Sequence, residues 1–179
     1  MWLATLALRG NRPRVVSASA MSPPVFAYTA LDAPESAHGA PMVETRECPL
    51  CRWAVDPNQR LVDRSGSALF LQNARMQGAL TGSGVIVPTR HAPTVFDLTE
   101  NELRDTFGLL AAVKDWMDRT YQPDGYNIGW NCGAAAGQEI MHAHLHVIPR
   151  FADEPFAGRG IRSWLKQDAN RRPRPGGHT

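Results

Sequence analysis

The pattern of hydrophobic and polar residues changes its period along the middle of the chain. Short apolar or alternating runs, which are typical of strands, lie on both sides of one longer segment with a helical period. The predicted strands cover residues 60–63, 68–72, 83–88, 126–131 and 141–149. Between the first two runs lies Arg64-Ser65-Gly66, a sequence that favours a hairpin.

The longer segment predicts one long helix. Thr99-Glu100-Asn101-Glu102 has the form of a capping box, in which the Thr99 hydroxyl accepts from the backbone N–H of Glu102. The apolar residues that follow at helical spacing are Leu103, Phe107, Leu110, Val113 and Met117. The helix should end before Pro123-Asp124-Gly125.

The order of three strands, a helix and two strands predicts an α+β fold. Strands that are adjacent in sequence usually become neighbours in space. We therefore expect an antiparallel sheet of about five strands with one long helix on one face.

The chain of 179 residues is long enough for one domain with a real core and too short for two comfortable ones. We place this domain at residues 46–167. Residues 1–45 mix Pro, Ala and Ser without a sustained period, which predicts a disordered N-terminal extension in which Met21 is an alternative start. Residues 168–179 predict a disordered basic C-terminal tail.

Charge and composition exclude several classes of protein. The net charge of +2 gives no case for a nucleic-acid partner, and no apolar run approaches the ~20 residues that a membrane span needs. The apolar start of the chain is followed, not preceded, by arginines, which is the wrong order for a secretory signal. Three cysteines, two of them in a Cys-x-x-Cys, favour metal or redox chemistry over a disulfide framework. We expect a soluble cytoplasmic protein.

The strongest functional signal is three histidines at strict alternation, His142, His144 and His146. In a strand these side chains share one face, while Ala143 and Leu145 share the other. A single strand histidine is most often a satisfied, partly buried imidazole. Three in register indicate a face that carries chemistry.

Cys48 and Cys51 predict a metal site in which the triad takes part. A redox role is disfavoured because the motif lacks the strand-then-helix context of thioredoxin-like sites. Tetrahedral zinc needs two more ligands, and the candidates are His91 and one triad histidine, with Cys132 as the competing thiol. Same-face histidines roughly 6.5 to 7 Å apart converge on one ion with difficulty. We therefore expect the end histidine to join a structural site and the middle one to be free as a nucleophile.

A free histidine can attack phosphorus and form a phosphoramidate that water later hydrolyses. The glycine-rich run at residues 133–138 leads directly into the triad, and its backbone N–H groups can approach an anion closely.

These residues resemble the signature of the histidine-triad (HIT) nucleotide hydrolases and transferases. The matching pattern is Asn131-x-Gly133-x-x-Ala136-Gly137-Gln138-x-x-x-His142-x-His144-x-His146-x-x-Pro149-Arg150. The resemblance covers the chain from Cys48 to about Arg150. It implies a homodimer that binds purine nucleotides and cleaves at the α-phosphate.

The resemblance also implies roles for individual residues. His144 would be the nucleophile, forming a nucleotidyl-histidine, and His146 would contact the phosphate. Asn131 and Gln138 would line the phosphate site, and Gly137 would permit close backbone approach. In similar proteins with a Cys-x-x-Cys, structural Zn²⁺ is held by residues corresponding to Cys48, Cys51, His91 and His142.

The chain departs from the family pattern in three ways, the first being that the segment from Leu71 to Gly82 is slightly longer than usual. Thr81-Gly82-Ser83 replaces the usual Pro-Gly-His, in the region of the nucleoside pocket where Asn73 is a candidate ribose contact. Glu139 follows Gln138 where Ser or Thr is common. An ionised carboxylate cannot donate to the phosphate and would repel it if it pointed inward.

Three functions follow from these residues. The leading one is a hydrolase or transferase acting on dinucleoside polyphosphates, nucleoside phosphoramidates or similar esters. The second is a nucleotide sensor with little turnover, to which Glu139 points. The third, a purely structural zinc protein, leaves His144 and His146 without a purpose.

Overall fold

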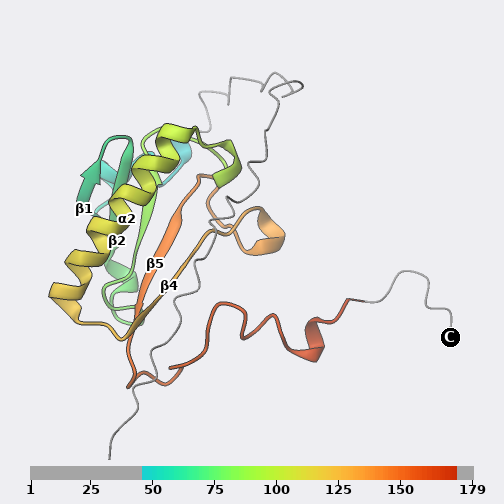
Figure 1. The fold of residues 1–179 in the computed structure, drawn as a ribbon. Helices are drawn as coiled ribbons and strands as arrows, with labels where there is room; N and C mark the ends of the chain where they lie inside the picture. The colour runs from blue at the N-terminus through green and yellow to red at the C-terminus, as the bar shows by residue number, and fades with distance from the viewer. Residues whose placement is uncertain (1–45, 173–179) are drawn as a thin grey trace, which may run out of the picture. The chain divides into compact units, whose positions relative to one another are not determined.

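The computed structural model describes residues 46–172, and Figure 1 shows their arrangement. The longer elements are β1 (Gln59–Ser65), β2 (Ala68–Asn73), β3 (Gly84–Pro88), α2 (Glu100–Tyr121), β4 (Gly125–Gly129) and β5 (Leu145–Arg150). Short 3-10 helices are η1 (Trp53–Val55), η2 (Ala74–Met76), η3 (Val95–Asp97), η4 (Ala134–Ala136) and η5 (Asp168–Asn170). The expected extension at residues 1–45 and most of the expected tail lie outside the described residues, so both stay predictions.

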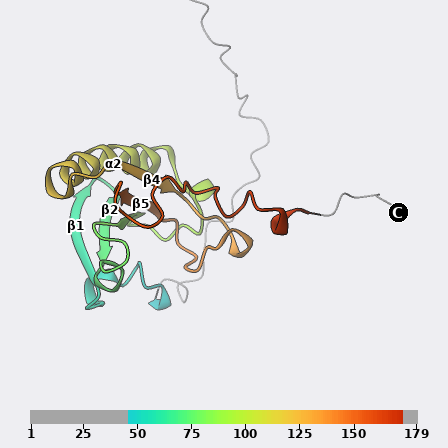
Figure 2. The ribbon, with the colours of Figure 1, turned by 90° about the horizontal axis from the view of Figure 1, so that it is seen from below.

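The five strands form one antiparallel sheet in the order β1-β2-β3-β5-β4. Helix α2 lies across one face of this sheet (Figures 1 and 2). The core between the two layers contains side chains that alternate along the strands, together with one stripe of the helix: Ala68, Phe70, Ile86, Leu145 and Val147 meet Leu109, Val113 and Met117. The predicted α+β fold is confirmed. No helix within residues 46–172 is long and apolar enough to cross a membrane.

The predicted capping box opens α2. The Thr99 hydroxyl accepts from the Glu102 backbone N–H at 3.3 Å, and the Glu102 carboxylate accepts from the Thr99 backbone N–H at 2.8 Å. Both donors would otherwise be unpaired at a helix start. The helix ends at Tyr121, where Gln122 takes a left-handed conformation just before Pro123.

The histidine strand is shorter than the sequence predicts, because β5 begins at Leu145 and not at residue 141. Before it the chain turns: the His142 backbone N–H donates to the Ile140 carbonyl at 2.8 Å, and that of Ala143 to the Ala92 carbonyl at 2.6 Å. Only His146 lies within the strand. Strand alternation therefore does not set the directions of His142 and His144, and the prediction that it does is wrong.

The sheet face opposite α2 carries its own rows of side chains. Directly opposed residues of antiparallel strands point to the same face, and Leu71 of β2 opposes Val85 of β3, which opposes His146 of β5. One row further along, Gln59 of β1 opposes Asn73 of β2. This face positions the candidate site.

Candidate functional site

A pocket of about 340 Å³ lies over this second face of the sheet. Leu71, Val85 and His146 contribute to its wall from three neighbouring strands. The segment that leads to β5 contributes His144, Glu139 and Gly137. A cavity of this size with apolar walls and a few polar groups suits a small ligand.

His144 is held with one ring nitrogen occupied. Its Nδ1 lies 2.7 Å from the carbonyl oxygen of His142, so Nδ1–H donates to that oxygen. In the neutral ring the other nitrogen, Nε2, then has a free lone pair. His144 is only 9% exposed yet lines the pocket. This arrangement fixes the orientation of the ring beside the pocket.

His146 lies beside it, with ring centroids 4.8 Å apart. Burial, and to a smaller extent the neighbouring His144, lowers the pKa of His146 below its ordinary value. Its Nε2 is buried and has no hydrogen-bond partner within residues 46–172. Buried polar atoms are nearly always paired, so this nitrogen points to a ligand.

His142 takes a different direction and joins a metal-type cluster. One ligand atom each from Cys48, Cys51, His91 and His142 lies within 4.8 Å of the others. The Sγ to Nδ1 distances are 3.5 Å for Cys48 to His142, 3.4 Å for Cys51 to His91 and 3.5 Å for Cys51 to His142. A tetrahedral ion with Zn–S of ~2.3 Å and Zn–N of ~2.0 Å would separate sulfur from nitrogen by about 3.5 Å. The donor set and its spacing therefore fit zinc.

The surroundings of His142 support this orientation. Its Nε2 lies 3.0 Å from the carbonyl oxygen of Pro88, an outer contact that leaves Nδ1 free to bind a metal. Burial lowers the pKa of His142 to about 4, which keeps the ring neutral. Burial and the neighbouring Cys48 raise the pKa of the Cys51 thiol to about 11 in the metal-free protein. A bound cation would reverse that preference, because it favours the thiolate.

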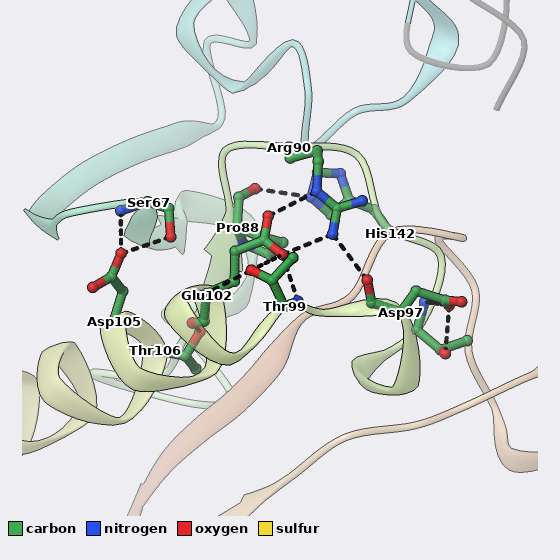
Figure 3. A network of polar contacts seen from close by, with 10 residues as sticks. Ser67, Pro88, Arg90, Asp97, Thr99, Glu102, Asp105, Thr106 and His142 are labelled. Atoms are coloured by element: carbon green, nitrogen blue, oxygen red, sulfur yellow. Dashed lines mark hydrogen bonds and ion pairs between the residues drawn. The ribbon is translucent and has the colours of Figure 1, made fainter. Parts of the chain in front are cut away.

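A polar network connects this cluster to the start of α2 (Figure 3). Arg90, the residue before His91, donates from Nε and Nη2 to the two carboxylate oxygens of Glu102 at 2.8 and 2.7 Å. The same carboxylate completes the capping box at Thr99. Its pKa is lowered, chiefly by the bond to Arg90. The loop that carries His91 is thus hydrogen-bonded, through Arg90, to the N-terminus of α2.

The loop before β5 is held by Gln138. Its Nε2 donates to the carbonyls of Pro93 and Ile140 at 2.6 and 3.1 Å, and its Oε1 accepts from the Gly133 backbone N–H at 2.7 Å. Both of its N–H donors are therefore occupied, and Gln138 does not line the pocket. Gly137, with φ of +84°, takes a conformation that favours glycine.

The structure brings most of the predicted site residues together. Asn73, Asn131, Gly137 and Glu139 line the same pocket as His144 and His146. Glu139 also borders a neighbouring depression beside Cys48 and His91. Cys132, the competing thiol, belongs to neither the pocket nor the metal-type cluster.

The sequence analysis missed several residues of the pocket. These are four apolar side chains and one amide: Leu50, Gln59, Met76, Leu80 and Ile140. Most of them lie in irregular segments, where hydrophobic period gives no signal. Gln59 precedes the first predicted strand by one residue, and a longer estimate of that strand would have placed it opposite Asn73.

Comparison with known families and proteins gives a consistent picture. A family model described as HIT domain matches residues 57–153. Among curated proteins, a bis(5'-nucleosyl)-tetraphosphatase (asymmetrical) of Schizosaccharomyces pombe is 37% identical over 84 residues, which are 47% of this chain and 44% of that protein. The chain spans about half the length of this relative and of several others that it matches.

Two further matches cover more of the chain. An adenosine 5'-monophosphoramidase of Saccharomyces cerevisiae is 26% identical over 132 residues, 73% of this chain and 75% of the relative. A crystal structure of a protein from Streptococcus mutans UA159 superposes with a TM-score of 0.55 and 26% identity, covering 63% of this chain and 71% of that one.

Proposed function

Because the chain belongs to the HIT domain family, we propose that it is a nucleotide hydrolase or transferase that works through a covalent nucleotidyl-histidine on His144. The observation that carries this proposal is the hydrogen bond from His144 Nδ1–H to the His142 carbonyl, which leaves Nε2 free at the pocket. The substrates we propose are dinucleoside polyphosphates or nucleoside phosphoramidates.

In the first step, the lone pair of His144 Nε2 attacks the α-phosphorus. The bond from phosphorus to the leaving group breaks, and the leaving group departs with the electron pair. The His142 carbonyl stabilises the positive charge that develops on the ring. In the second step, water or another acceptor attacks the same phosphorus, and the P–N bond breaks with its electron pair returning to Nε2.

His146 serves the phosphate in this proposal. The neutral ring, as the Nε2–H tautomer, donates to a phosphate oxygen and so gains the partner that its buried nitrogen lacks. Asn131, whose Nδ2 donates to the Gly137 carbonyl at 3.3 Å, and Gly137 line the same pocket and assist. A direct phosphate contact by Gln138 stays a prediction, and its observed bonds support a role in positioning the loop.

The nucleoside occupies the apolar part of the pocket in this proposal. Asn73 is the proposed ribose contact, and its Oδ1 already accepts from the Arg75 backbone N–H at 2.9 Å. Its amide N–H groups therefore remain for a ribose hydroxyl. Leu71 and Val85 supply a surface for the base.

Product analysis on a panel of adenylated and guanylated substrates tests this proposal. Release of a nucleoside monophosphate, with a phosphoramidate trapped on His144 by rapid acid-free denaturation and mass spectrometry, is the expected result. A modified residue elsewhere would reject His144 as the nucleophile.

A nucleotide sensor is the second candidate, and Glu139 is the observation that favours it. The residues that line the pocket include neither Lys nor Arg, while the acidic residue Glu139 is among them. Tight binding of a nucleoside monophosphate without turnover of any substrate would support the sensor.

We further propose that Cys48, Cys51, His91 and His142 hold one structural Zn²⁺. Thiolate ligands that remain reduced suit the cytoplasm, which is the location we propose. Elemental analysis of protein purified without chelator should give one zinc per chain. Zinc retained in the double variant Cys48→Ser with Cys51→Ser would exclude this site.

The proposed assembly is a homodimer formed along β4. This strand is at the edge of the sheet, and its Ile128 is partly exposed. Large exposed apolar side chains follow β5, among them Ile161, Trp164 and Leu165. Light scattering after size exclusion should give twice the mass of the chain. The double variant Trp164→Asp with Leu165→Asp should have the mass of a single chain.

A further inference from the structure

Two buried side-chain atoms of the described residues lack a hydrogen-bond partner, and both belong to residues that line the pocket. One is His146 Nε2, which the proposed phosphate contact satisfies. The other is Gln59 Oε1, for which neither the fold nor the proposed chemistry provides a partner. A buried carbonyl oxygen without a partner is rare in folded proteins. Gln59 therefore points to a hydrogen-bond donor on a bound molecule.

The register of the sheet places Gln59 at the far end of the pocket from the histidines. Gln59 begins β1, and three strand spacings, about 14 Å in total, separate β1 from β5, which carries His146. Asn73, the proposed ribose contact, directly opposes Gln59 from β2, one strand nearer to β5. Across the sheet the order is thus His146 on β5, Val85 on β3, Leu71 beside Asn73 on β2, and Gln59 on β1.

This order matches the parts of a nucleotide. With the α-phosphate at His146 and the ribose at Asn73, the edge of the base that is farthest from the sugar lies toward Gln59. In adenine that edge carries the 6-amino group, an N–H donor. Leu71, on the same strand as Asn73, offers apolar contact to the flat face of the ring but cannot tell one base from another.

We propose that Gln59 determines base specificity, its side-chain oxygen accepting a hydrogen bond from the 6-amino group of an adenine nucleotide. The inference rests on the proposed function for the location of the phosphate. A site built to pair a polar group rejects an analogue that lacks this group, because its own buried atom is then left unpaired. The expected preference for the amino group is about tenfold or more.

The test uses two ligands that differ only in this donor, adenosine and purine riboside, which lacks the 6-amino group. As 5'-phosphoramidates they report kcat/KM. As 5'-monophosphates they report affinity by calorimetry and need no turnover. The variants are Gln59→Leu, which removes the acceptor, and Gln59→Glu, which keeps it. Gln167→Leu makes the same change at an exposed position outside the pocket and is the matched control.

We expect the wild type, Gln59→Glu and the control to prefer the adenosine ligand, and Gln59→Leu to bind both ligands equally. An unchanged preference in Gln59→Leu, an equal loss for both ligands, or a wild type that does not prefer the adenosine ligand over the purine riboside ligand would each overturn the inference. If Gln59→Leu does not fold, Gln59→Met replaces it. If no phosphoramidate is hydrolysed, the proposed function fails while the monophosphate affinities still decide the role of Gln59.

Discussion

Each histidine of the triad has its own proposed role, and the most direct prediction concerns His144. His144→Ala should reduce turnover by at least about a thousandfold, because it removes the attacking nitrogen, while nucleotide affinity changes only a fewfold. Steady-state kinetics and calorimetry on the same preparation measure both quantities. Cys132→Ala, a nearby change outside the pocket and the metal-type cluster, serves as the control. Activity of His144→Ala within a fewfold of the wild type would refute the assignment.

Glu139 is the residue at which this chain leaves the family pattern. Because the chain before β5 is irregular, strand alternation does not set the direction of Glu139, and the residue lines the pocket. Glu139→Thr should raise kcat/KM for anionic substrates, because it removes a repulsion and supplies a donor.

The size of that effect follows from exposure. A hydrogen bond to a charged group contributes about 1.5 to 3 kcal/mol, but Glu139 is exposed, and solvent screens its charge. We therefore expect a gain of a fewfold up to about tenfold that shrinks with added salt. Glu100→Thr, an exposed carboxylate at the start of α2, is the control. A kcat/KM at or below that of the wild type on several substrates would reject an inward role for Glu139.

At the scale of elements, the start of α2 is fixed by a buried carboxylate that has four donors. Glu102 accepts from Arg90 through two nitrogens and from the backbone N–H and hydroxyl of Thr99. Glu102→Ala removes the partner of the Thr99 backbone N–H and of the half-exposed Arg90, and should lower the free energy of unfolding by about 1 to 2 kcal/mol. Glu100→Ala, which removes an exposed acid two residues earlier, should lower the free energy of unfolding by less than about 1 kcal/mol. Urea denaturation of the two variants compares them, and equal losses would show that the network adds nothing.

The elements also show how far sequence reasoning extends. The capping box at Thr99 and the helical period after it predicted α2 correctly, because local signals determine a helix start. The hairpin of β1 and β2 was predicted from its turn. The histidine strand was predicted too long, since alternating residues continue through a segment that is held out of the sheet by a local turn at Ile140 and a long-range hydrogen bond from Ala143 to Ala92. Gln59 and Met76 entered the pocket through tertiary packing, for which no local pattern exists.

At the scale of the whole molecule, the metal-type cluster joins the two ends of the domain. Cys48 and Cys51 come from its beginning, His91 from the loop after β3, and His142 from the segment before β5. Cys48 and Leu50 also pack with Leu71 and Val87 in a second apolar cluster on the pocket side of the sheet. Metal binding should therefore stabilise the pocket wall as well as the fold, since ligand binding energy adds to folding energy.

The metal-free protein should lose stability in acid through His142. Burial lowers the pKa of His142 to about 4 in the folded chain, against 6.5 for an ordinary histidine. The unfolded chain then binds the proton first, so the stability is fully present above pH 6.5 and is lost as pH falls toward 4. The shift corresponds to about 3 kcal/mol. Cys51 acts at the other end, because its raised pKa of about 11 removes stability as pH rises above 9.

Urea unfolding of chelated protein at pH values from 4 to 10 measures this profile, and we expect a maximum between the two limits. His142→Gln keeps a polar side chain of similar size that does not titrate. Its free energy of unfolding should therefore fall less between pH 6.5 and 4 than that of the parent. With zinc restored, the parent should be more stable throughout neutral pH and should release the metal in acid, because protons compete for the thiolates. If the free energy of unfolding falls equally steeply between pH 6.5 and 4 in His142→Gln and in the parent, other groups cause the loss of stability in acid. The neutral His142 ring would then not be its source.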